Sequence, residues 1–161
     1  MTGIDPGQLM KLVIRPTLTA IGLGGPAAEQ LMLGTAAQES RCGRYLAQIG
    51  GPALGPWQME PATHDDLWTN TLTGKPDLAA RVKALLPATC DRRQQLVTNL
   101  AYACAMARLV YWRAPASLPP AGDIEAQAAF YKRFYNTPAG AATVGQYISN
   151  WHAATDGQPF A

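Results

Sequence analysis

Proline opens successive apolar segments of this chain, and this placement constrains the fold more than any other sequence feature. Proline lacks an amide hydrogen and fixes φ near the helical value, so it suits the first turn of an α-helix and interrupts regular structure elsewhere. Segments with helical periodicity begin at Pro6, Pro26, Pro61 and Pro76. The pattern predicts a mainly α-helical protein.

The expected helices lie between breaks at glycine and proline. They cover residues 6–23 with a bend at Pro16, 26–42, 61–72, 76–86, 91–112, 123–135 and 139–154. The segment 91–112 is the longest, and its apolar stripe predicts the central core helix. Residues 155–161 are expected to form a loose end.

One segment, residues 44–60, breaks the helical pattern. It contains Gly50, Gly51, Pro52 and Gly55 within a few positions, and such residues mark tight turns. We expect a structured loop or a small hairpin. Because binding residues are often carried on loops that a rigid scaffold positions, this segment is a candidate binding loop.

Length and composition favour one globular domain that spans residues 1–161. The chain of 161 residues is long enough to bury a core, and its composition of 48% hydrophobic and 15% charged residues excludes a disordered protein. The net charge is only +2, and the sequence has no run of Lys or Arg. We therefore expect no nucleic-acid partner.

The three cysteines, Cys42, Cys90 and Cys104, are far apart in the sequence and odd in number. No CxxC pair or Cys/His cluster accompanies them, so neither a zinc site nor a disulfide framework is expected. We interpret them as free thiols and expect neither metal nor cofactor.

Glu39 is the first candidate for chemistry. It lies near the end of an expected helix, and helix neighbours such as Met32 and Ala36 are apolar. Burial there would raise the pKa of the carboxyl group and make it a proton donor near neutral pH. The alternative is a surface glutamate that pairs with Arg41 or Arg44.

The loop supplies two further candidates, Trp57 and Gln58. An indole ring can stack on the face of a sugar, and an amide can hydrogen-bond a hydroxyl or acetamido group. The alternative for Trp57 is that its ring fixes the loop to the core, and the two roles are compatible.

Tyr135 and Asn136 are a further pair of candidates, at the end of the expected helix 123–135. A tyrosine hydroxyl at a helix terminus can reach across a cleft to a carboxylate. The alternative is that Tyr135, like Tyr131 and Phe134, is a core aromatic.

Three short motifs, in this order and spacing, resemble the catalytic domain of soluble lytic transglycosylases (SLT) and the related goose-type lysozymes. They are Glu39-Ser40, the segment Gly55-Pro56-Trp57-Gln58-Met59-Glu60-Pro61-Ala62-Thr63, and Tyr135-Asn136 with Gly140. The resemblance covers about residues 27–150 and is nearest to small phage-encoded muralytic proteins. The chain departs from the family at Pro56-Trp57, where Leu-Met is usual, and in its aromatic segment 130–136.

The resemblance implies a mainly α, lysozyme-like helical domain with a small loop or hairpin lining the active-site cleft. It implies cleavage of the β-1,4 bond between N-acetylmuramic acid and N-acetylglucosamine in peptidoglycan, without a cofactor. Glu39 would act as general acid and then as base, and Tyr135 would orient Glu39 or the acetamido group of the substrate. The implied substrate-binding residues are Ser40, Trp57, Gln58, Met59 and Asn136.

Two other functions are compatible with the same residues. An inverting hydrolase on the same scaffold needs a second carboxylate, for which Glu60, Asp65 and Asp66 are the candidates. A non-catalytic virion or wall-binding protein would keep the cleft only to bind glycan.

The expected partner is the glycan strand of peptidoglycan, together with other virion proteins if the chain is part of a virion. Residues 1–7 lack the basic and apolar regions of a signal peptide, and the apolar stretch 96–112 contains Asn99 and Arg108. We therefore expect no membrane insertion. Synthesis would take place in the cytoplasm of a host bacterium, with action on the cell wall after release or from a virion.

Overall fold

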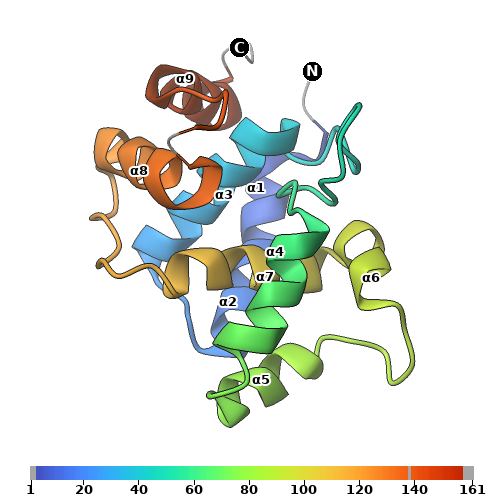
Figure 1. The fold of residues 1–161 in the computed structure, drawn as a ribbon. Helices are drawn as coiled ribbons and strands as arrows, with labels where there is room; N and C mark the ends of the chain where they lie inside the picture. The colour runs from blue at the N-terminus through green and yellow to red at the C-terminus, as the bar shows by residue number, and fades with distance from the viewer. Residues whose placement is uncertain (1–2, 138, 158–161) are drawn as a thin grey trace.

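A computed structural model describes residues 3–137 and 139–157 and shows a mainly helical fold, which confirms the predicted fold class at that level (Figure 1). In chain order the elements are α1 (Pro6–Gln8), η1 (Leu9–Ile14), α2 (Arg15–Ile21), α3 (Pro26–Ser40), α4 (Pro61–Asp66), η2 (Leu67–Thr71), α5 (Pro76–Lys83), α6 (Arg92–Thr98), α7 (Leu100–Trp112), α8 (Ile124–Tyr131), η3 (Lys132–Asn136) and α9 (Val144–Asp156). The η elements are π-helical.

The helix starts predicted from proline are confirmed. Helices α1, α3, α4 and α5 begin at Pro6, Pro26, Pro61 and Pro76. The ends are less predictable, because they depend on single residues that leave the helical region. Helix α3 stops at Ser40, two residues before the expected end, since Arg41 and Cys42 adopt positive φ values of 53° and 58°.

The expected single helix over residues 91–112 is wrong, because Asn99 divides it into α6 and α7. Asn99 has extended dihedrals (φ −129°, ψ 96°), and its side chain accepts a hydrogen bond from the Tyr102 amide as an N-cap. Its Nδ2 also donates to the Leu85 carbonyl oxygen at 2.8 Å, which ties the break to the preceding loop. The second half, α7, is the expected core helix: all residues from Tyr102 to Tyr111 are buried.

Helix α7 passes through the middle of the molecule and contacts α2, α3, α5 and α6 (Figure 1). Helix α3 is buried along most of its length and packs on α9. This packing requires Gly34, since a Cβ atom there would lie 2.1 Å from the Tyr147 hydroxyl oxygen. The close packing of α3 against α9 fixes the position of its last turn, which carries Glu39.

The segment between α3 and α4 is a structured loop, as predicted. Among the described residues, regular strands do not form; the loop has two isolated antiparallel bridges, Ala47–Leu54 and Leu54–Met59. Gly55 lets the loop approach α6, because it has a φ of 77° and a Cβ atom there would lie 2.1 Å from the Leu96 carbonyl oxygen.

The last third of the chain differs from the expected boundaries. The helix predicted over residues 123–135 is α8 followed by the π-helical η3, which extends it to Asn136. The final helix, α9, begins at Val144 rather than 139, where Thr143 and Gln146 form a capping box. It continues through residues 155 and 156, which were expected to be loose, and residues 158–161 of that expectation lie outside the described residues.

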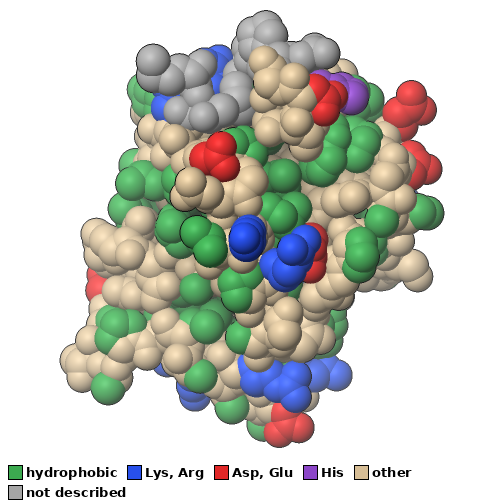
Figure 2. Space-filling model, turned by 180° about the vertical axis from the view of Figure 1, so that it is seen from behind, with side chains coloured by type: hydrophobic (Ala, Val, Ile, Leu, Met, Phe, Trp, Pro, Cys, Tyr) green, Lys and Arg blue, Asp and Glu red, His purple; other side chains and the backbone are tan. Residues whose placement is uncertain are grey.

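The face seen from behind carries charged side chains of both signs in small separate groups among hydrophobic and other residues (Figure 2). Within the described part of the chain, every helix is too short or too polar to cross a membrane.

Candidate functional site

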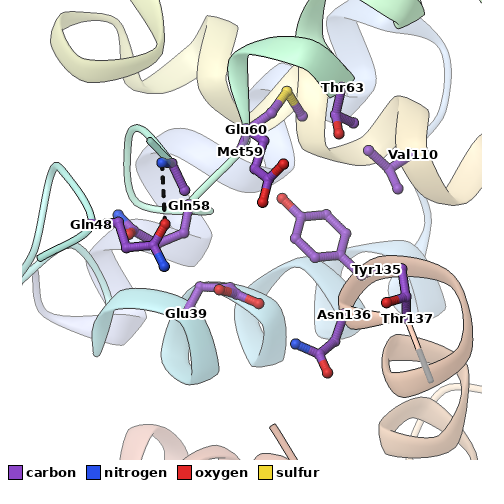
Figure 3. Close-up of a pocket in the computed structure, with 11 residues that line it drawn as sticks. Glu39, Gln48, Gln58, Met59, Glu60, Thr63, Val110, Tyr135, Asn136 and Thr137 are labelled. Carbon is purple, nitrogen blue, oxygen red and sulfur yellow. Dashed lines mark hydrogen bonds between the residues drawn. The ribbon is translucent and has the colours of Figure 1, made fainter. Parts of the chain in front are cut away.

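A cleft of about 500 Å³ lies where the end of α3, the loop, the start of α4, and η3 meet (Figure 3). Its lining residues are Glu39, Gln48, Ala53, Gln58, Met59, Glu60, Thr63, Val110, Tyr135, Asn136 and Thr137. Six of the residues predicted for the site therefore lie together, although they come from segments about 100 positions apart in the sequence: Glu39, Gln58, Met59, Glu60, Tyr135 and Asn136.

Glu39 lies in the last turn of α3 and is only partly exposed. Burial raises the pKa of its carboxyl group to about 7, and the partial negative charge at the helix C-terminus acts in the same direction. A hydrogen bond from the Tyr131 hydroxyl to Glu39 Oε1, at 2.6 Å, moderates this shift. The group can therefore both hold and release a proton near neutral pH.

The tyrosine that contacts Glu39 is Tyr131, whereas the sequence predicted Tyr135. The Tyr135 hydroxyl donates instead to the Trp57 carbonyl oxygen at 2.7 Å, and its ring forms part of the cleft wall. The two rings are stacked, with centroids 6.0 Å apart. Tyr131 lies one helical turn before Tyr135 and so shares its face, which is the only sequence signal that points to it.

Burial keeps Tyr131 protonated. Its pKa is raised well above the usual value by burial and by the nearby Glu39 charge. The hydroxyl group therefore remains a hydrogen-bond donor in either ionisation state of Glu39. A role for Tyr135 toward substrate stays a prediction.

The prediction that Trp57 stacks on a sugar is wrong for this structure, because its indole is buried in the core with 1% exposed. Its Nε1–H donates to the Met32 carbonyl oxygen at 2.9 Å, which fixes the loop to α3. The alternative role of Trp57, in which its ring fixes the loop to the core, is the one observed.

Ser40 is also not a substrate contact, because only 1% of it is exposed. Its hydroxyl donates to the Pro56 carbonyl oxygen at 2.6 Å and accepts from the Gly43 amide at 2.7 Å. The bond with Gly43 closes the turn after α3, and the bond with Pro56 joins the end of α3 to the loop. Ser40 therefore acts on the site only through the loop.

Gln58 and Met59 line the cleft as predicted. Gln58 has a positive φ of 45°, and its Nε2 donates to the Gly55 carbonyl oxygen at 2.8 Å, so the side-chain oxygen is left as the acceptor. Met59 is nearly buried and supplies apolar surface.

The candidate second carboxylates separate into two groups. Glu60 is exposed, lines the cleft, and projects into it from the side opposite Glu39 (Figure 3). Asp65 is not a lining residue, and its carboxylate is held in an ion pair with Arg93. Hydrogen bonds from Arg93 and His64 lower the pKa of Asp65 to about 2, so the prediction for Asp65 is corrected. Asp66 is likewise paired with Arg113.

The sequence did not single out several other lining residues, and Gln48 is the most polar of them. Its Oε1 accepts from the Ala53 amide at 3.3 Å, which closes the tip of the loop beside the cleft. Its signal in the sequence is weak, since a glutamine before two glycines has many possible roles.

Across the residues that the structure describes, His, Cys, Asp and Glu do not gather in groups of three or more that could hold a metal ion. The three cysteines are free, and burial raises the pKa of the Cys42 thiol to about 12.

Comparison of the chain with models of known protein families, with curated proteins and with solved structures finds no match. The functional inference therefore depends on the geometry of the cleft and on the short motifs that build it.

Proposed function

We propose that this chain is a lytic transglycosylase that cleaves the β-1,4 bond between N-acetylmuramic acid and N-acetylglucosamine in peptidoglycan. In this proposal the helical domain is lysozyme-like, and the cleft over Glu39 holds the glycan strand. The observation that carries the proposal is the Glu39 carboxyl group, which lines a cleft of about 500 Å³ with its pKa raised to about 7 by burial.

The position of Glu39 suits the acid step of glycoside cleavage. A protonated carboxyl group donates its proton to the glycosidic oxygen as the bond from that oxygen to the sugar C1 breaks. The acetamido oxygen of the same sugar stabilises the positive charge that develops at C1, so a second carboxylate is not needed for this step.

The second step reuses the same group. Glu39, now ionised, accepts the proton of the sugar 6-hydroxyl as the O6 atom bonds to C1. The product is a 1,6-anhydro sugar, and Glu39 ends the cycle protonated as it began. A pKa near the working pH lets one carboxyl group serve in both directions.

The other lining residues have supporting roles in this scheme. Tyr131 holds Glu39 Oε1 in place through its 2.6 Å hydrogen bond. The amides of Gln58 and Asn136 bind polar groups of the glycan, and Met59 forms apolar floor. Tyr135 shapes the wall and holds the loop through the Trp57 carbonyl oxygen.

One observation favours a second candidate, an inverting hydrolase. Glu60 enters the cleft from the side opposite Glu39, as a base that activates water would (Figure 3). Inverting glycosidases place their two carboxyl groups about 6.5–9.5 Å apart, with the water between them. In that reaction Glu60 is essential, whereas the transglycosylase needs only Glu39.

Incubation of the purified protein with cell-wall sacculi, followed by mass spectrometry of the released muropeptides, tests these candidates. The transglycosylase yields anhydro products that lack one water, about 18 Da lighter than the hydrolase products. Glu39→Gln is expected to abolish release, and Glu60→Gln is expected to retain it. Reducing-end products from the wild type, together with a loss of release in Glu60→Gln, would favour the hydrolase.

The same assay separates an enzyme from a glycan-binding protein. Co-sedimentation of the chain with sacculi, without any released muropeptide, would contradict both catalytic candidates and favour the binding role. A protein that neither binds sacculi nor releases muropeptides would overturn the proposal as a whole.

A further inference from the structure

The side-chain amide of Asn136 is held in one orientation by its neighbours at the end of η3. Lys132 Nζ donates to Asn136 Oδ1 at 2.9 Å and to the Gly140 carbonyl oxygen at 2.6 Å. An ammonium group has only donors, so the oxygen of the amide must face Lys132. The nitrogen therefore lies on the other side, toward Glu39 (Figure 3).

The turn after η3 is packed against this same amide. A Cβ atom on Gly140 would lie 2.3 Å from Asn136 Oδ1 and 2.4 Å from the Asn136 carbonyl oxygen. Only a residue without a side chain fits there. The ammonium group and the glycine together confine the amide, so a simple rotation of the amide plane is opposed by both.

The cleft thus presents amides of opposite polarity. Gln58 donates its Nε2 to the Gly55 carbonyl oxygen, which leaves its oxygen as an acceptor. Asn136 has its oxygen occupied by Lys132, which leaves its Nδ2 hydrogens as donors. The charged groups in the lining are the carboxyl groups of Glu39 and Glu60, which disfavour an anionic ligand atom beside them.

We propose that Lys132 is a positioning residue that makes Asn136 a hydrogen-bond donor to an acceptor oxygen of the bound sugar beside Glu39. The inference rests on the proposed function, since it assumes a neutral glycan in the cleft. The acceptor is either an acetamido carbonyl oxygen or a sugar hydroxyl oxygen. Both chemistries accept a hydrogen bond from Nδ2 and carry no charge.

Calorimetric titration of the Glu39→Gln protein, which should not turn over its ligand, tests the proposal with two neutral β-1,4 oligosaccharides. Chitotetraose carries acetamido groups, and cellotetraose carries hydroxyls in their place. Asn136→Ala is expected to weaken binding about 3- to 10-fold, the loss of one hydrogen bond. A loss confined to chitotetraose identifies the acetamido carbonyl, and an equal loss for both identifies a hydroxyl.

A double-mutant cycle separates positioning from support of the turn. Lys132→Met is expected to weaken binding about threefold or more when Asn136 is present and to have no effect in the Asn136→Ala background. The Lys132–Gly140 hydrogen bond is lost in both backgrounds, so its effect cancels. An equal loss in the two backgrounds would show that Lys132 only holds the turn, and would overturn the proposal.

Asn136→Asp provides a second variant whose fold is protected. It keeps an acceptor for Lys132 but has no N–H donor, so binding should weaken at least as much as in Asn136→Ala while the thermal midpoint is retained. Unchanged affinity in Asn136→Asp and Asn136→Ala would overturn this inference alone. A Glu39→Gln protein that binds neither oligosaccharide nor sacculi would overturn both this inference and the proposed function.

Discussion

The hydroxyl group of Tyr131 donates a 2.6 Å hydrogen bond to Glu39 Oε1, although the two residues are 92 positions apart in the sequence. This contact joins the end of α3 to α8 beside the cleft. The hydrogen bond fixes the carboxyl group in place and stabilises its ionised form, which lowers its pKa, whereas burial raises it. Burial is the larger influence and leaves the pKa of Glu39 at about 7.

Removal of the Tyr131 hydroxyl should raise the pKa of Glu39 further. In Tyr131→Phe the carboxylate loses its donor, so the protonated form is favoured and the basic limb of the pH–activity profile moves to higher pH. Activity at pH 7 should fall about tenfold, because the acid is no longer oriented. Carbon-13 NMR titration of the Glu39 carboxyl group measures the shift. Tyr135→Phe is the matched control, since its hydroxyl contacts the Trp57 carbonyl oxygen, and an equal pKa shift there would contradict the assignment.

The raised pKa of Glu39 also predicts how stability depends on pH. Between about pH 4.5 and 7 the folded protein binds a proton that the unfolded chain has released, so the free energy of unfolding falls as pH rises through this window. Glu39→Gln lacks the titrating group, so its free energy of unfolding should not fall in this window. The variant should be more stable than the wild type above pH 7, by up to about 3 kcal/mol, and the difference should fade as pH falls from 7 to 4.5 and be absent below pH 4.5. Denaturant unfolding at several pH values measures it, and a difference independent of pH would contradict the burial of the charge.

Ser40 should contribute to stability rather than to substrate binding. In Ser40→Ala the buried Pro56 carbonyl oxygen and the Gly43 amide both lose a partner, so the free energy of unfolding should fall by about 1–3 kcal/mol. Thr98→Ala removes an exposed hydroxyl that bonds the Gln94 carbonyl oxygen, and should change stability by less than about 0.5 kcal/mol. Urea unfolding of the two variants gives the comparison. Equal unfolding midpoints would show that the Ser40 contacts do not contribute to stability.

Gly140 should be required for the position of Asn136. An added Cβ atom would lie 2.3 Å from Asn136 Oδ1, so Gly140→Ala must displace the amide or the turn, and muralytic activity should fall about tenfold. Gly145→Ala is the matched control, because the nearest atom, Thr143 Oγ1, is 4.0 Å away and the residue lies in the first turn of α9. It should leave activity unchanged and stabilise the helix slightly. Release of muropeptides from sacculi measures both, and equal activities would contradict the close packing.

Much of the secondary structure could be predicted from local rules. Proline at the first helical position marked the starts of α1, α3, α4 and α5, because its restricted φ acts within one residue. The break at Asn99 was missed although its signal is local. Asparagine is a favoured N-cap, but the apolar periodicity on both sides outweighed it in the prediction.

The position of Glu39 was also foreseeable, since the apolar face of α3 and the turn after Ser40 bring this carboxyl group to a buried helix end. The residues that surround Glu39 in the folded protein were not foreseeable. Trp57 was predicted to face a ligand and lies in the core, because its indole N–H has a partner in the Met32 carbonyl oxygen that only the packing of the loop on α3 brings near. Asp65 was considered for catalysis and is instead paired with Arg93, from another helix.

The sequence by itself determined that the protein is mainly helical, where many helices begin, and that Glu39 and a glycine-rich loop stand close together along the chain. Only the tertiary structure decided that Tyr131 rather than Tyr135 reaches Glu39, that Ser40 and Trp57 hold the loop, and that Glu60 shares the cleft. The physical reason is the distance along the chain over which the determining interactions act. Helix starts and turns follow from dihedral preferences of adjacent residues, whereas hydrogen-bond partners and burial depend on segments that meet only when the chain has packed.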